Sequence, residues 1–86
     1  MRIRNSRKKY TIKITYMQQS IDIFFGRHLK KLREKQNKSV NIFGYENDLT
    51  PATISRIENG LISPRLQTLK KIADGLDISL KDLLDF

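Results

Sequence analysis

Helix start and stop signals divide the second half of the chain into short segments. Ser39, Thr50 and Ser79 each precede a run of residues with helical character, and serine and threonine are favoured at helix N-caps. Pro51 suits the first position of a helix, and Gly60 suits the C-cap that ends it. The spacing predicts helices near residues 39–46, 50–60, 66–76 and 79–84.

An apolar stripe predicts one more helix, from an N-cap near Ser20 to about Asn37. Ile21, Phe25, Leu29 and Leu32 recur at the spacing of one helix face. The link between the second and third helices is only about three residues long, which forces a steep angle between them. The fold class expected for residues 20–86 is therefore a compact all-α domain of five helices.

Residues 1–19 are expected to form a basic N-terminal arm outside this domain. Within it, residues 10–17 alternate apolar and polar side chains, which predicts a strand, although nothing else in the chain offers a strand partner. A different interpretation is that Met17 is the true start and that residues 1–16 are not native. The sequence leaves both interpretations open.

The charge of the chain indicates a polyanionic partner. Among 86 residues, 17 are Lys or Arg and 9 are Asp or Glu, a net charge of +8. Residues 1–16 carry six bases and no acid. Nucleic acid is the first candidate and an anionic membrane surface the second. No apolar run is long enough to span a bilayer, and no secretory signal is evident, so a cytoplasmic protein is expected.

Catalysis and cofactor binding are not expected. The chain has no cysteine and a single histidine, His28, so a thiolate site, a histidine metal site and a catalytic triad all lack partners. His28 is expected to be a solvated helix residue. Four aspartates near the C-terminus are interpreted as solvated charge. We expect no metal, no cofactor and no enzymatic activity.

Residues 25–84 resemble the phage-repressor and Cro type of helix-turn-helix, also called the XRE family. The resemblance rests on a spaced set of residues, namely Phe25-Gly26, Leu29, Leu32-Arg33, Ser39, Phe43-Gly44, Leu49-Thr50, Ile54–Gly60, Pro64, Leu69, Ile72-Ala73, Leu76 and Leu83-Leu84. Two departures stand out. Val40 replaces the glutamine that usually contacts DNA, and Asp48 replaces the usual turn glycine. The resemblance implies a λ-repressor-like fold and binding to double-stranded DNA.

A helical wheel for residues 50–60 places Ala52, Arg56 and Asn59 opposite the core-facing Ile54. In this motif the N-terminal half of the third helix enters the major groove. The expected DNA-binding positions are Ser39, Val40, Thr50, Pro51, Ala52, Thr53, Ser55, Arg56, Asn59 and Arg65. Arg56 is the candidate for reading guanine, with a phosphate contact as the alternative. Lys30 and Lys31 are interpreted as a solvated face.

Three functions from different classes fit these features. The leading hypothesis is a transcriptional regulator, a repressor acting as a homodimer on a palindromic operator, with a dimer contact at Leu80, Leu84 and Phe86. The second is an antitoxin whose strand at residues 10–17 pairs with a toxin partner. The third is a peripheral membrane binder that uses the basic arm. The resemblance also implies a partly buried ion pair between Arg33 and Glu58.

Overall fold

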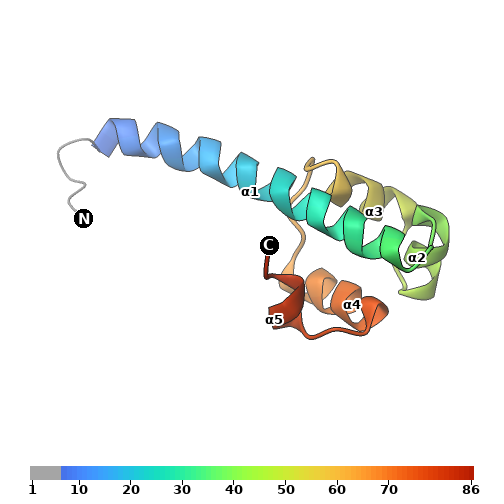
Figure 1. The fold of residues 1–86 in the computed structure, drawn as a ribbon. Coiled ribbons are helices and arrows are strands. Elements are labelled where there is room, and N and C mark those ends of the chain that lie inside the picture. Colours follow the sequence, from blue (N-terminus) through green and yellow to red (C-terminus); the bar gives the residue numbers. More distant parts are fainter. Residues whose placement is uncertain (1–6) are drawn as a thin grey trace.

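The computed structural model describes the backbone of residues 7–86 and the side chains of residues 21–86. Residues 7–86 form five helices and no strand: α1 (Arg7–Lys35), α2 (Val40–Glu46), α3 (Pro51–Glu58), α4 (Leu66–Leu76) and α5 (Leu80–Leu83). The C-terminal half of α1 lies along α3, whereas its N-terminal half projects from the domain (Figure 1). The predicted all-α fold with five helices is confirmed.

The predicted helix starts at residues 39, 50 and 79 are confirmed by their hydrogen bonds. The Ser39 hydroxyl accepts the Ile42 amide N–H at 3.1 Å, and the Ser79 hydroxyl accepts the Asp82 amide at 3.0 Å. The Thr50 hydroxyl accepts the Thr53 amide at 3.1 Å, with Pro51 at the first helical position. Each cap satisfies an amide that the helix itself leaves without a partner.

The N-terminal part of α1 corrects two predictions. Residues 10–17 lie inside α1 and do not form a strand, and Ser20 lies within the helix instead of capping it. The physical reason is pairing: no other described segment offers a strand edge, whereas a helix satisfies its backbone hydrogen bonds internally. The helix also ends at Lys35, slightly before the predicted end near Asn37, which has a positive φ of 56°.

The core lies where α1, α2, α3, α4 and α5 meet. Its fully buried large side chains are Leu29, Phe43, Ile54, Ile57, Ile72 and Leu83. Helix α1 approaches α3 closely at Gly26, where an added Cβ would overlap the carbonyl oxygen of Ile57 and lie 2.8 Å from the carbonyl carbon of Glu58. The domain therefore holds its third helix against α1 through backbone contact as well as side chains.

His28 differs from its prediction. Its side chain is only half exposed, and its ring stacks on that of Phe86 with 5.6 Å between centroids. Its Nε2 atom is buried and has no hydrogen-bond partner in the described part of the chain. The C-terminal residue folds back onto α1 and covers the ring, which composition does not reveal.

None of the described helices combines the length and the apolar character needed to cross a membrane.

Candidate nucleic-acid interface

The α2–α3 unit is held at a fixed angle by a tight link. An added Cβ at Gly44 would lie 3.0 Å from the Leu49 carbonyl oxygen and 3.2 Å from the Pro51 nitrogen. The Leu49 amide donates to the Gly44 carbonyl at 2.8 Å, and Asp48 takes a left-handed conformation with φ of 58°. Glycine is the residue that allows such a close approach of two backbone segments, and aspartate tolerates the left-handed conformation of the turn better than most residues. The start of α3 is therefore fixed relative to α2.

Helix α3 has one buried face and one open face. Ile54 and Ile57 are fully buried, while Ala52, Ser55, Arg56 and Asn59 are exposed. Thr53 and Pro51 are half-buried at the edge of the open face. The wheel drawn from the sequence placed these residues correctly. The open face therefore presents small side chains and one arginine to the solvent.

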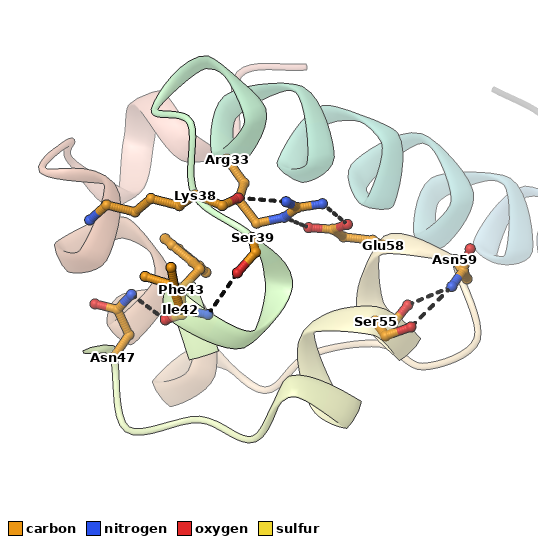
Figure 2. Close-up of polar contacts among 9 residues, drawn as sticks. All are labelled: Arg33, Lys38, Ser39, Ile42, Phe43, Asn47, Ser55, Glu58 and Asn59. Atoms are coloured by element: carbon orange, nitrogen blue, oxygen red, sulfur yellow. Dashed lines mark hydrogen bonds and ion pairs between the residues drawn. The ribbon is translucent and has the colours of Figure 1, made fainter. Parts of the chain in front are cut away.

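Hydrogen bonds within α3 orient part of its open face. The Asn59 amide nitrogen donates to the Ser55 carbonyl at 2.9 Å and lies 3.4 Å from the Ser55 hydroxyl (Figure 2). The Thr50 and Thr53 hydroxyls are 2.8 Å apart. Sequence reasoning missed this hydroxyl pair, although two threonines three residues apart at an N-cap are a usable signal. Arg56 has no such bond among the described residues.

The remaining predicted contact residues lie on α2 and at the start of α4. Ser39 is exposed, and its hydroxyl serves the cap of α2. Val40, which stands where the family usually has a DNA-contacting glutamine, is half-buried and packs against the core. Ile42, on the same helix, is exposed. Arg65 is exposed at the N-cap position of α4 and makes no side-chain cap bond. In the described part of the chain, the Arg65 guanidinium, like that of Arg56, has no hydrogen-bond partner.

An ion pair ties α1 to the end of α3, as the sequence predicted. The Arg33 Nε donates to Glu58 Oε2 at 2.7 Å, and its Nη2 donates to Glu58 Oε1 at 2.9 Å (Figure 2). The two side chains are only 8% and 6% exposed. Arg33 also donates to the Lys38 carbonyl at 2.7 Å. The hydrogen bond and charge of Glu58 raise the pKa of Arg33, against the effect of burial.

A capped α2, a tight turn and an α3 with an open polar face define a helix-turn-helix DNA-binding domain. The family model described as "Helix-turn-helix" matches residues 29–83. The chain belongs to this helix-turn-helix family. It is a DNA-binding transcriptional regulator, and the expectation that it is not an enzyme is confirmed by its family.

Two control proteins are among the most similar curated relatives. Control protein C.BamHI of Bacillus amyloliquefaciens is 37% identical over 71 residues, which is 81% of this chain and 88% of that protein. Control protein C.MunI of Mycoplasma sp is 45% identical over 64 residues, 73% of this chain and 86% of that protein. These relatives are similar to the chain over nearly their whole length.

A longer repressor and a solved structure are also similar. The HTH-type transcriptional repressor RghR of Bacillus subtilis (strain 168) is 39% identical over 61 residues, 70% of this chain but 45% of the repressor. The crystal structure of the restriction-modification controller protein C.AhdI from Aeromonas hydrophila aligns with a TM-score of 0.73 at 25% identity. That alignment covers 76% of this chain and 94% of the controller.

Proposed function

We propose that the chain acts in the cytoplasm as a transcriptional repressor that binds a palindromic operator in double-stranded DNA as a homodimer. The observation that carries the proposal is the open face of α3, which is exposed, weakly polar and held rigidly by α1 and α2. A recognition helix of this kind enters the major groove, and a two-fold dimer matches a two-fold DNA site. The net charge of +8 supports binding to a polyanion.

The size of the relatives favours a particular kind of regulator. The control proteins match over most of both chains, whereas the repressor match covers less than half of that protein. The structurally similar C.AhdI is a restriction-modification controller protein, and this similarity suggests which genes the present chain controls. We infer that the promoters regulated by this chain are those of a restriction-modification system.

The surface at the C-terminal end supports the homodimer. Leu84 and Phe86 are both exposed although they are large and apolar, while Leu80 packs partly against the core. Apolar side chains gathered on the surface of a small protein indicate an interaction site. The antitoxin hypothesis rested on a strand at residues 10–17 that would pair with a toxin. Those residues are helical, so this argument for an antitoxin no longer holds.

The proposed DNA contacts follow from where each side chain lies. Arg56 reads a guanine through its O6 and N7 atoms, and Ala52, Pro51 and the Thr53 methyl lie against thymine methyl groups. Ser55 contacts a base edge without strong preference. The phosphates are contacted from the flanks by the backbone at Ser39 and Val40 and by the side chains of Thr50, Asn59 and Arg65.

Replacing Arg56 with alanine is expected to relax the base preference at one position in each half-site. The lost bidentate contact with guanine corresponds to about 1–3 kcal/mol of discrimination. Binding to the operator and to single-base variants of it, measured by fluorescence anisotropy, would show the change. Arg65→Ala is the matched control, because losing a phosphate contact weakens all sequences alike. If Arg56→Ala also weakens all sequences alike, Arg56 binds phosphate and the base assignment is wrong.

The affinity for DNA is expected to fall steeply as salt concentration rises. Each phosphate neutralised by Lys or Arg releases condensed cations, so the slope of log affinity against log salt should be steeper than about −3. Titrations between low and physiological salt would give the slope. A slope near zero would contradict DNA binding as the function.

Selection of bound sequences from random DNA tests the whole proposal. We expect two half-sites related by a two-fold axis and separated by about one helical turn of 10 base pairs. A single half-site without symmetry would contradict the dimer while leaving DNA binding intact. Recovery of no enriched sequence would contradict sequence-specific regulation.

A further inference from the structure

Two adjacent lysines in the C-terminal half of α1, Lys30 and Lys31, are both exposed. Neither takes part in an ion pair among the described residues. Glu34 stands four residues after the first lysine and three after the second, so the same acid of α1 is a neighbour of both. A difference in function between the two lysines must therefore come from the side of α1 on which each one lies.

Lys30 belongs to the row of α1 residues that runs beside α3. Residues three or four apart share one face of a helix, and this row consists of Ile23, Gly26, Lys30 and Arg33. An added Cβ at Gly60, just after α3, would lie 2.8 Å from the Cγ1 atom of Ile23, and one at Gly26 would lie 2.8 Å from the Glu58 carbonyl carbon. Arg33 donates two hydrogen bonds to Glu58 (Figure 2). Because the row contacts the α3 region on both sides of Lys30, Lys30 lies on the α3 side of α1.

Lys31 lies about 100° further around the helix, towards the C-terminal segment. His28, three residues before Lys31, stacks its ring on that of Phe86 with 5.6 Å between the centroids. Ile21, seven residues before His28, lines an apolar hollow together with Phe86. These contacts mark the side of α1 that faces away from α3. The two lysines, which the sequence treated alike, are thus separated by the fold.

The part of α3 beside Lys30 belongs to the flank of the proposed recognition surface. Asn59 directly follows Glu58, is exposed, and donates to the Ser55 carbonyl at 2.9 Å. When the N-terminal half of α3 enters the major groove, residues on its flank face the sugar-phosphate backbone at the edge of the groove. Lys30 adds a positive charge from α1 to this flank.

We propose that the Lys30 ammonium binds a phosphate on the flank of each operator half-site, and that Lys31 makes no contact with DNA. The inference rests on the DNA-binding function proposed above and adds to it a contact from outside the α2–α3 unit. A lysine ammonium binds phosphate as a point charge, without base preference. Lys30 therefore contributes affinity and orients α1 on the duplex, while the sequence preference stays with α3.

Replacing each lysine with glutamine distinguishes a contact from the general field of the protein. The probe is a labelled duplex with the sequence recovered by selection from random DNA. Lys30→Gln should make the slope of log affinity against log salt shallower by about 0.9, so its loss of affinity should be about 3.5 times larger at 50 mM than at 200 mM salt. Lys31→Gln, the matched control, should leave the slope unchanged. Glutamine is a good helix former, so both variants should keep the urea midpoint of the unchanged protein.

Two results of this titration would overturn the proposal. Equal changes of slope in the two variants would mean that both charges act through the field around the protein, which extends about 10 Å at 0.1 M salt. An unchanged slope for Lys30→Gln would exclude the contact, while a steep slope of the unchanged protein would leave the proposed function standing. A slope near zero for the unchanged protein would instead contradict DNA binding itself, so the two failures are distinguishable.

Neutral phosphate analogues give an independent measurement and locate the contact. In a methylphosphonate, a methyl group replaces one charged phosphate oxygen, and a series of duplexes can carry one such group at each position along the flank of the half-site. The unchanged protein and Lys31→Gln should lose affinity at one position where Lys30→Gln loses none, because its contact there is already absent. If every position weakens Lys30→Gln as much as the unchanged protein, Lys30 binds no phosphate and the proposal is wrong.

Discussion

Replacing Arg33 with methionine or Glu58 with glutamine is expected to lower the free energy of unfolding by about 3–5 kcal/mol. The pair is buried, bidentate and short, with Nε and Nη2 of Arg33 at 2.7 and 2.9 Å from the two carboxylate oxygens. Removing one partner leaves the other charge in a site with little access to water. The Arg33 variant also leaves the Lys38 carbonyl without its donor.

The double variant separates the value of the pair from the cost of a stranded charge. A buried ion pair contributes little as a whole, because both groups lose hydration when the protein folds. Arg33→Met combined with Glu58→Gln should therefore recover part of the loss seen in each single variant. Urea midpoints for the three variants and the unchanged protein would show the coupling. Strictly additive losses below about 1 kcal/mol each, as for an exposed pair, would contradict it.

The direction of the Arg33 pKa sets the pH range of this contribution. Glu58 raises the pKa of Arg33 in the folded protein. A raised pKa means that the stabilisation is fully present below the pKa of the unfolded chain and is lost only as pH rises through the folded value. The ordinary pKa of arginine already lies far above neutral, so the guanidinium stays charged at any pH used for DNA binding.

The elements that the sequence predicted correctly depend on local chemistry. A serine or threonine hydroxyl caps a helix through an amide two or three residues away, so Ser39, Thr50 and Ser79 needed no tertiary information. The two faces of α3 follow from its period alone, which is why the burial of Ile54 and Ile57 and the exposure of Arg56 were predicted.

The predictions that failed concern residues whose environment is set by segments distant in the sequence. Residues 10–17 alternate as a strand does, but so short a run is also compatible with a helix. Only the backbone, which is helical there, chooses between them. His28 was expected in solvent because nothing in the sequence shows that Phe86 returns to stack on it. The half-buried state of Val40 likewise depends on a core assembled from distant helices, which its place in the sequence does not show.

The sequence predicted which residues of the candidate site are exposed, but it did not predict which base each of them contacts. The exposed residues on α3 and the exposed Arg65 are where the sequence placed them. Which base each side chain reads depends on how the domain sits in the groove, and the fold of one copy does not set that position. In a dimer, the contact between the two copies would set the distance between the two recognition helices, and that distance is not a property of one copy.

Replacing Gly26 with alanine is expected to destabilise the protein, although helix propensity predicts the opposite sign. Within a helix, alanine is favoured over glycine by about 1 kcal/mol. At Gly26 the added Cβ would overlap the Ile57 carbonyl oxygen and lie 2.8 Å from the Glu58 carbonyl carbon. These are backbone atoms of α3, so no side chain can rotate away, and α1 and α3 must separate.

The expected net loss for Gly26→Ala is at the upper end of the range for overpacked sites, about 1–3 kcal/mol and occasionally more. Separating the helices would also stretch the Arg33–Glu58 pair, which joins them within the same contact. Gly75→Ala in α4 is the matched control. It brings the same gain in helix propensity but meets the side chain of Asn47 instead of backbone. Asn47 can rotate away at the cost of its hydrogen bond to the Phe43 carbonyl, so a smaller loss is expected there. Urea midpoints measured for both variants would rank them, and a Gly26→Ala protein as stable as the unchanged chain would mean that α1 and α3 are further apart than described.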